Sequence, residues 1–243
     1  PVQEIFAQCP DDTGLGLAVA NRLKKAAGFR TVDANAQALP RSEQFRLIGI
    51  TGGTGAGKTT ALRELGRLGV HVIDCDQVYH ELLLGSDALR EELAGRFGRE
   101  IFSPEGLDRK KLGELVFRDK AAMDDLNRIT HKYVEAETDR QITDARRAGM
   151  PGAAVDAILL LEGELGRRCD VTVGIIAPVE DRVRRLMARE GISEEYARTR
   201  IAAQKPDEFY RRSCTYILEN NGTQAQFARA AGDLFQRMFK EEN

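Results

Sequence analysis

The chain has 243 residues, enough for one large or two small domains, and its 42% hydrophobic and 30% charged residues are ordinary for a globular protein. Its 36 basic and 38 acidic side chains give a net charge of −2, so no basic excess favours nucleic acid or an anionic membrane as a partner. The sequence has no apolar run near the roughly 18 residues of a membrane-spanning helix. It also has no signal-peptide pattern and no C-x-x-C pair, and for these reasons we expect a cytoplasmic protein.

The first 44 residues precede the first strong motif, and their sequence assigns them no function. Residues 15–27 show the apolar spacing of an amphipathic helix. The polar stretch that follows contains Pro40 and is typical of a linker. We therefore expect an N-terminal extension over residues 1–44 and a separate domain over residues 45–243.

The next stretch combines a strand, a glycine-rich loop and a helix. Residues 45–50 form a short apolar run that predicts a buried strand, and the leucine spacing over residues 61–68 predicts a helix. Between them stands Gly-x-x-x-x-Gly-Lys-Thr, residues 52–59, the pattern of a phosphate-binding loop. Strand, loop and helix are the context that this motif requires.

The residue types of this loop suit phosphate chemistry. Glycines allow positive φ values and let backbone N–H groups approach phosphate oxygens, while the helix N-terminus adds partial positive charge. Lys58 can reach the β and γ phosphates, and the Thr59 hydroxyl can bind Mg²⁺. The predicted nucleotide-binding residues of the loop are Gly53, Thr54, Gly55, Ala56, Gly57, Lys58, Thr59 and Thr60.

Two carboxylates end the next predicted strand, which covers residues 70–76. In a doubly wound sheet the ligand crevice lies at the carboxyl ends of the strands, so we expect Asp74 and Asp76 near the loop, pointing to the same side of an extended strand. A carboxylate there can accept a proton from an attacking hydroxyl. The alternative is that Asp76 caps the helix predicted over residues 77–84. We favour a catalytic role for Asp76, which capping would not exclude.

Residues 85–150 are predicted to be mostly helical. Apolar residues recur at helical spacing over residues 87–97 and 110–117, and a long helical pattern over residues 121–148 contains His131. An insertion of this size is too long for an ordinary loop. We therefore interpret residues 85–150 as a helical subdomain that binds the substrate.

A nearly continuous apolar run over residues 153–162 is typical of a central strand in a parallel sheet. Asp156 interrupts it. This carboxylate could contact the coordination shell of a magnesium ion. Alternatively, it could be a buried Asp at a strand end whose hydrogen bonds are satisfied within the protein. The sequence does not decide between the two. Further predicted elements are strands over residues 171–176 and 216–218, a turn at residues 220–222 and a helix over residues 223–240.

A basic helix with four arginines follows the strand over residues 171–176, and a second helix is predicted over residues 193–204. Such a pair suits a lid, here residues 182–205, that closes over a transferring phosphate, excludes water and adds positive charge. Arg185 and Arg189 are four residues apart and share one helix face, and we assign both a catalytic role. Arg182 is interpreted as part of a solvated charged face.

Together these motifs resemble those of the dephospho-coenzyme A kinase family. The resemblance extends from about residue 45 to residue 240. The Asp-x-Asp strand end, Leu-Asp-Arg and Asn-Asn-Gly make it more specific than a phosphate loop alone. The segments that carry it are residues 50–60, 72–76, 107–117, 155–162, 185–189, 200–204 and 220–222, together with His131.

The resemblance implies an α/β fold: a P-loop kinase core with a parallel sheet flanked by helices, a helical acceptor-binding insertion and a lid. It also implies phosphate transfer from ATP, with Mg²⁺, to the ribose 3′-hydroxyl of dephospho-CoA, the last step of coenzyme A synthesis. ATP and dephospho-CoA are then the partners of a monomer. Asp76 would be the base on that hydroxyl, and Asn220 and Asn221 would lie near the adenine of ATP. The expected substrate-binding residues are Asp74, His80, Arg109, His131 and Asp156.

The sequence departs from the family at several positions. Lys132 follows His131 where the family usually has Pro. Ile158 stands where Pro is frequent, His80 where many members have Arg, and Thr215 where Asp is usual. These departures concern the acceptor site rather than the reaction.

Other functions stay open at this point. One is a kinase of another small nucleoside or nucleotide on the same core, and another is a P-loop ATPase that needs no acceptor. The close pair of carboxylates at the end of the second strand argues against the ATPase. Residues 1–44 could also dock a partner to a kinase.

Overall fold

The computed structural model describes residues 45–103, 106–157 and 160–240. These residues divide into two compact units, one formed by residues 74–141 and the other by residues 45–73 and 142–240. The extension expected over residues 1–44, with its predicted helix, lies outside the described residues, and so does Ile158.

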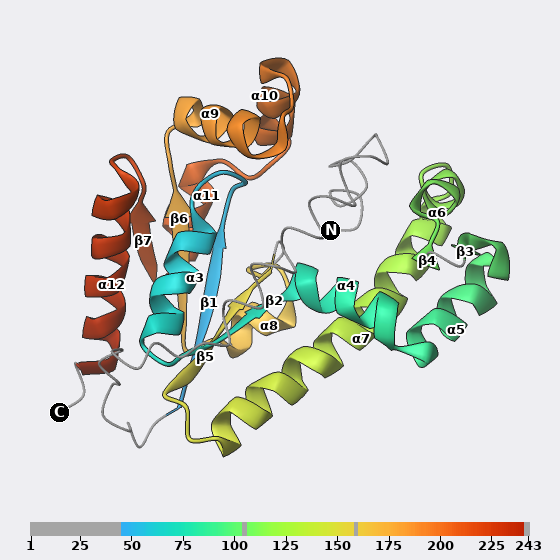
Figure 1. Cartoon of the computed structure of the whole chain (residues 1–243), viewed down its shortest axis with the longest axis horizontal. Coiled ribbons are helices and arrows are strands. Elements are labelled where there is room, and N and C mark those ends of the chain that lie inside the picture. Colours follow the sequence, from blue (N-terminus) through green and yellow to red (C-terminus); the bar gives the residue numbers. More distant parts are fainter. Residues whose placement is uncertain (1–44, 104–105, 158–159, 241–243) are drawn as a thin grey trace. The chain divides into compact units, whose positions relative to one another are not determined.

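A five-stranded sheet with the order β2-β5-β1-β6-β7 forms the centre of the larger unit (Figure 1). Strand β1 pairs in parallel with β5 on one side and with β6 on the other, and β6 pairs in parallel with β7. Strands that come later in the chain thus flank β1 on both sides, which places the loop after β1 at a topological switch point. The strands are β1 (Arg46–Gly52), β2 (His71–Asp74), β5 (Gly152–Asp156), β6 (Val171–Ile176) and β7 (Tyr216–Glu219).

One face of the sheet packs against two helices, α3 (Lys58–Arg67) and α12 (Gln224–Lys240) (Figure 1). Alternate residues of a strand point to the same face, and Ile48 and Ile50 of β1 point to this one. Both are fully buried in a core cluster that includes Phe235 of α12. Because each fully buried side chain of this size contributes about 1.5–3 kcal/mol, this cluster is a main source of the unit's stability.

Glycine allows close packing on the opposite face. A Cβ atom at Gly49 would lie 2.6 Å from Leu160 Cδ2, and one at Gly174 would lie 3.2 Å from Tyr210 Cβ. Tyr210 belongs to α11 (Asp207–Ser213), a helix absent from the sequence prediction, as is α8 (Glu164–Arg168). The missing side chains let these segments lie directly on the strands.

The strand predicted over residues 153–162 is shorter than expected. Strand β5 ends at Asp156, and the N–H of Leu160 donates to the carbonyl of Ala157 in a turn. Leu160 is still buried, because it packs against Gly49 from this turn rather than from the strand. The apolar run over residues 153–162 therefore includes residues that are buried against the sheet without belonging to a strand.

The smaller unit is built mainly from helices around its own apolar core, in agreement with the helical character predicted for residues 85–150. Leu89, Leu93, Leu112 and Leu126 are fully buried in this core. A short antiparallel pair joins two of the helices. The elements are α4 (Cys75–Gly85), α5 (Asp87–Phe97), η2 (Arg99–Ile101), β3 (Phe102–Ser103), β4 (Gly106–Leu107), α6 (Arg109–Val116) and most of α7 (Lys120–Arg147).

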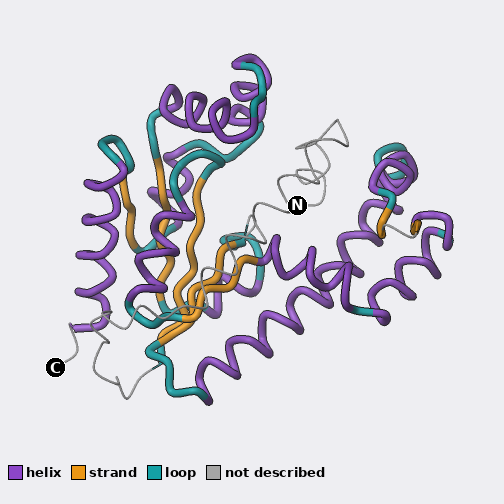
Figure 2. Tube along the Cα trace, viewed as in Figure 1, coloured by secondary structure: helices purple, strands orange, loops and turns teal. Residues whose placement is uncertain are grey.

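Two further helices of the larger unit, α9 (Val179–Glu190) and α10 (Glu194–Ala202), cover the region predicted as a lid. They pack on each other through a small apolar cluster that includes Leu186 and Ala197. Helix α9 follows β6, and the connection between them lies at the same end of the sheet as the loop after β1 (Figure 2). The lid region and the glycine-rich loop are therefore neighbours.

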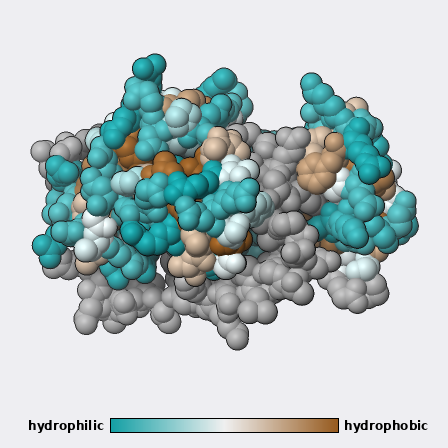
Figure 3. Space-filling model, turned by 90° about the horizontal axis from the view of Figure 1, so that it is seen from above, coloured by the Kyte–Doolittle hydropathy of each residue, from teal (hydrophilic) through white to brown (hydrophobic). Residues whose placement is uncertain are grey.

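In the described part of the chain, no helix combines the length and the apolar character needed to cross a membrane. Hydrophilic residues cover most of the described surface visible in Figure 3, with smaller apolar patches between them.

Candidate active site

The loop between β1 and α3 has the backbone of a phosphate-binding loop. Gly52, Gly55 and Gly57 have φ values of 141°, 74° and 116°, a region that favours glycine. Helix α3 begins directly afterwards at Lys58, with Gly57 as its N-cap residue. The unpaired N–H groups of a helix N-terminus and its partial positive charge are therefore directed at the loop, which suits an anion.

The glycines also make room for protein groups. A Cβ atom at Gly53 would lie 2.2 Å from Arg182 Nη2, and one at Gly57 would lie 2.4 Å from Asn220 Nδ2. A side chain at either position would therefore require Arg182 or Asn220 to move. The sequence explained the glycines by the approach of phosphate, and the structure adds that two side chains from distant segments already lie against the loop.

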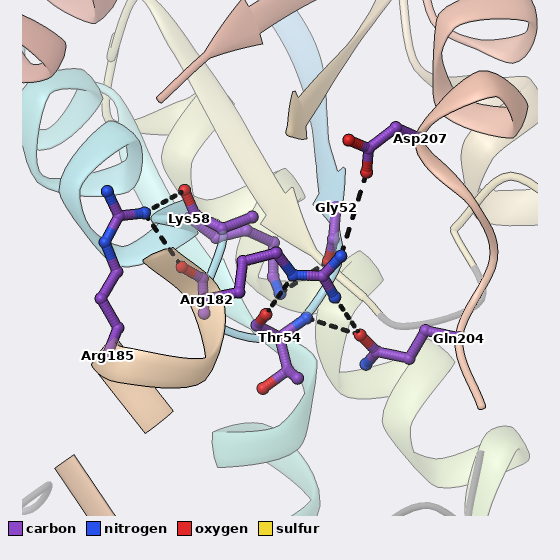
Figure 4. A network of polar contacts seen from close by, with 9 residues as sticks. Gly52, Thr54, Lys58, Arg182, Arg185, Gln204 and Asp207 are labelled. Carbon is purple, nitrogen blue, oxygen red and sulfur yellow. Dashed lines mark hydrogen bonds and ion pairs between the residues drawn. The ribbon is translucent and has the colours of Figure 1, made fainter. Parts of the chain in front are cut away.

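Lys58 and Thr59 occupy the first turn of α3. The Lys58 ammonium donates to the carbonyl oxygen of Gly52 across the loop, with an Nζ–O distance of 3.1 Å (Figure 4). Thr59 is exposed. Lys58 is half-buried, and the phosphate-binding role of Lys58 and the metal-binding role of Thr59 stay predictions.

Arg185 of α9 is one of the predicted catalytic residues, and it contacts the loop. Its Nη1 donates to the carbonyl oxygen of Gly55 at 3.1 Å, and its Nη2 lies 3.2 Å from Asn220 Oδ1. Asn220 is 6% exposed and donates from Nδ2 to the carbonyl oxygen of Ala56 at 2.7 Å. The two side chains together hold the second half of the loop, whereas the neighbouring Asn221 is exposed.

Arg182 corrects the sequence interpretation, which placed it on a solvated face. It is only 3% exposed, and its Nε donates to the carbonyl oxygen of Thr54 at 2.9 Å (Figure 4). Its Nη2 donates to Gln204 Oε1 at 2.7 Å, and Asp207 Oδ1 lies 3.9 Å from its Nη1. Burial lowers the pKa of Arg182, but a guanidinium keeps its charge in proteins.

Helical spacing places Arg182 on the same face of α9 as Arg185, but spacing alone does not show that Arg182 is buried. Arg182 stands three residues before Arg185, so both side chains lie on the face of α9 that meets the loop. Arg189 lies one turn further along this face and bonds to Glu190, which also pairs with Arg200. The catalytic role expected of Arg189 stays a prediction.

The second strand ends earlier than the sequence suggested, and this changes the roles of its two carboxylates. Helix α4 begins at Cys75, and Asp74 is its N-cap: Asp74 Oδ1 accepts from the backbone N–H groups of Asp76 and Gln77 at 3.0 and 3.1 Å. The expectation that both carboxylates share one side of a strand was wrong, and so was the alternative that Asp76 is the cap. Asp76 lies inside the first turn of the helix.

Two predicted substrate-binding residues come together in the helical unit. Arg109 Nη2 lies 2.8 Å from His80 Nδ1, and because Arg can only donate, His80 accepts at Nδ1. The neighbouring Tyr79 is buried, which raises its pKa to about 12, although the charge of Arg109 opposes the shift. Tyr79 belongs to the apolar core of this unit, so the pair lies beside that core.

His131 lies on the exposed side of α7. Its neighbour Lys132, a departure from the family pattern, donates to Glu92 Oε2 at 2.8 Å and links α7 to α5. Tyr133 donates its hydroxyl to the same oxygen, also at 2.8 Å. Lys132 therefore makes a solvent-exposed ion pair between these two helices.

Asp156 is the last residue of β5 and stands opposite Ile50 of β1, two residues before the glycine-rich loop begins. Both interpretations of this carboxylate stay open. Thr215 lies at the other end of the sheet, just before β7, where its Oγ1 accepts from the N–H of Thr172 at 3.1 Å. This departure from the family pattern is thus remote from the loop in the larger unit.

A parallel sheet with a glycine-rich loop after β1, and an arginine-bearing helix against that loop, define the class of P-loop phosphotransferases. A family model described as "Dephospho-CoA kinase" matches residues 46–226. The chain therefore belongs to the dephospho-CoA kinase family. The resemblance and the α/β fold predicted from the sequence are confirmed.

Individual relatives agree with this assignment. A dephospho-CoA kinase from Geobacter sulfurreducens is 36% identical over 196 residues, which are 80% of this chain and 100% of that protein. One from Corynebacterium glutamicum is 35% identical over 81% of this chain and 98% of that protein.

Solved structures show the same fold. TT1252 from Thermus thermophilus superposes with a TM-score of 0.67 at 32% identity, covering 81% of this chain and 99% of that chain. The dephospho-CoA kinase from Campylobacter jejuni has a TM-score of 0.54 at 24% identity, covering 79% of this chain and 97% of that chain. The P-loop kinase core is thus supported by sequence and by three-dimensional similarity.

Proposed function

We propose that the chain transfers the γ-phosphoryl group of ATP to the ribose 3′-hydroxyl of dephospho-CoA, the last step of coenzyme A biosynthesis. ATP-dependent phosphorylation of dephospho-CoA is the reaction of the family to which the chain belongs. The observation that carries the proposal is the loop after β1, whose three positive-φ glycines lead into the N-terminus of α3 beside Lys58. This is the backbone arrangement that binds nucleotide phosphates.

On the nucleotide side, loop residues 53–60 surround the phosphates and Lys58 moves from the Gly52 carbonyl to the β and γ phosphates. A lysine side chain reaches a new partner by rotation about its flexible stem. Arg185, which already lies against the loop, places positive charge where the transferred group becomes more negative. Arg189 adds charge from the next turn of α9. Asn220 and Asn221 lie near the adenine.

Magnesium fits this chain as an ion that arrives with the nucleotide. Among residues 45–103, 106–157 and 160–240, no three His, Cys, Asp or Glu side chains form a group that could hold a metal. Mg²⁺ in kinases commonly takes one or two protein ligands, with phosphate oxygens and water as the others. The hydroxyl of Thr59 would hold the ion directly, and Asp156 would contact its water shell. When bound there, the ion would supply positive charge that offsets the charge of the phosphates.

On the acceptor side, Asp76 orients the ribose hydroxyl and accepts its proton. Asp74 is the N-cap of α4, so Asp76 is not required for capping. His80 and Arg109, which contact each other, bind the acceptor together with His131, and Asp74 contributes through the position of the α4 N-terminus. Phosphoryl transfer is mainly a matter of such positioning and charge stabilisation.

We also propose a cytoplasmic monomer whose partners are small molecules rather than nucleic acid. The net charge of −2 gives no long-range attraction to a polyanion. Light scattering during size-exclusion chromatography measures the mass, which for a monomer is 26.9 kDa. A mass of twice this value would contradict the monomer.

A coupled assay of ADP release tests the reaction. We expect rapid turnover with dephospho-CoA and little with adenosine or nucleoside monophosphates. Preferential turnover of one of the latter would assign the chain to another acceptor. ADP release that no acceptor changes would favour an acceptor-independent ATPase.

A further inference from the structure

The two ends of the predicted lid, residues 182–205, meet at one residue of the phosphate loop. Arg182 stands near the start of α9, and Gln204 follows the end of α10. Arg182 Nε donates to the carbonyl oxygen of Thr54 at 2.9 Å, and the N–H of Thr54 donates to Gln204 Oε1 at 2.8 Å. Both backbone polar groups of Thr54 are thus bound by side chains that are distant in the sequence.

A third hydrogen bond closes the arrangement. Arg182 Nη2 donates to Gln204 Oε1 at 2.7 Å, so this oxygen accepts from the loop N–H and from the guanidinium together (Figure 4). Arg182 is 3% exposed, and a buried charge of this kind is stable only when its donors have partners. We call the three residues Thr54, Arg182 and Gln204 the Thr54 clamp.

Thr54 lies in a flexible part of the loop. It stands between Gly53 and Gly55, and Gly55 has a φ of 74°. Glycine has more backbone freedom than any other residue, so the peptide groups on both sides of Thr54 can otherwise rotate easily. The clamp fixes the carbonyl on one side and the N–H on the other.

We propose that Arg182 and Gln204 are positioning residues for nucleotide binding, which orient the peptide groups of Thr54 before ATP arrives. The inference rests on the proposed binding of ATP phosphates by the loop. Arg182 acts through Thr54 and not by contact with the reacting atoms. A loop that is already oriented loses less entropy when it binds, so ATP affinity depends on the clamp.

A purely structural role makes a different prediction. If the clamp only attaches α9 to the sheet, its loss lowers the unfolding temperature but leaves the affinity of the folded protein for ATP unchanged. If the clamp positions the loop, its loss weakens ATP binding in molecules that are still folded. The dissociation constant for ATP therefore separates the two roles.

The test uses the full chain with Arg182→Met, Gln204→Met and the double variant. Methionine matches glutamine in length, fills the space of the aliphatic part of arginine, and removes the hydrogen bonds of both. Arg184→Met is the matched control, because Arg184 lies on the same helix but is 75% exposed and pairs with Asp181. Calorimetric titration with ATP and Mg²⁺ gives the dissociation constants, and thermal unfolding gives the folded fraction.

We expect each single variant to raise the ATP dissociation constant roughly tenfold or more, the size expected for lost hydrogen bonds to a charged or buried group. The double variant should be weaker by less than the product of the single effects, because the Arg182–Gln204 bond is counted in both. Arg184→Met should bind ATP within twofold of the wild type. The KM for dephospho-CoA should stay within twofold in every folded variant.

Dissociation constants within twofold of the wild type for both single variants would overturn the proposal in favour of a structural clamp. If Arg182→Met does not fold, Gln204→Met decides alone, since it leaves the Arg182–Thr54 bond in place. Unchanged ATP binding by Lys58→Ala would instead overturn the phosphate assignment of the loop. A wild-type chain that binds ATP but does not phosphorylate dephospho-CoA would overturn the proposed acceptor and leave the clamp standing.

Discussion

Asp74 and Asp76 are two residues apart, yet the structure predicts opposite results when each is replaced. Asp74 Oδ1 accepts hydrogen bonds of 3.0 and 3.1 Å from two N–H groups that would otherwise be unpaired at the start of α4. Replacing an N-cap Asp by Ala costs about 1 kcal/mol. For a protein of this size, Asp74→Ala should therefore lower the unfolding temperature by roughly 2–4 °C.

Asp76→Asn leaves the cap intact, because the backbone N–H of residue 76 still donates to Asp74. The unfolding temperature should stay close to that of the wild type. If Asp76 acts on the ribose hydroxyl, kcat should fall by roughly 10²-fold or more, with little change in ATP affinity. Part of this loss comes from orienting the hydroxyl, since a loose phosphoryl-transfer transition state needs little base assistance.

The assay combines thermal unfolding with steady-state kinetics on both variants, and ATP affinity is measured separately. A kcat within threefold of the wild type for Asp76→Asn would remove Asp76 from the mechanism. An unfolding temperature that falls with Asp76→Asn but not with Asp74→Ala would contradict the cap assignment. Asp74→Asn serves as the control, because Asn also caps helices and should restore the stability lost with alanine.

Three further predictions concern the loop and the chain ahead of it. Lys58→Ala should abolish turnover with little change in the unfolding temperature, because Lys58 bonds to a loop carbonyl and packs in no core. Near-normal turnover would contradict its role in binding phosphate. Gly57→Ala should weaken ATP binding and lower the unfolding temperature, because its Cβ atom would lie 2.4 Å from Asn220 Nδ2 and residue 57 has a φ of 116°. Wild-type ATP affinity and unfolding temperature would show that the loop accommodates the methyl group. A chain beginning near Glu43 should fold and keep its activity, and an insoluble product would show that residues 1–44 cover core surface.

Elements of regular secondary structure were predictable because their pattern is local. The helix expected over residues 87–97 and the strand expected over residues 171–176 appear with those bounds as α5 and β6. The end of β2 was harder to place, because the chain passes from strand to helix at Asp74 without a glycine or proline to mark the change. A carboxylate at that point is equally compatible with a strand end and a cap.

Arg182 shows why part of the site could not be predicted. The spacing of the arginines on α9 was visible, but burial of one of them depends on a carbonyl 128 residues away in the sequence. Local pattern contains no information about such a partner. The phosphate loop was predictable for the opposite reason, since its strand, glycines and helix N-terminus are contiguous.

The absence of a side chain at Gly53 has a consequence for how this protein can change during evolution. The guanidinium of Arg182 lies where a Cβ atom at residue 53 would be. A larger residue at 53 therefore requires the Arg182 guanidinium to move, which would break its hydrogen bonds to Thr54 and Gln204, unless a shorter residue stands at 182. In related proteins these two positions are therefore expected to vary together.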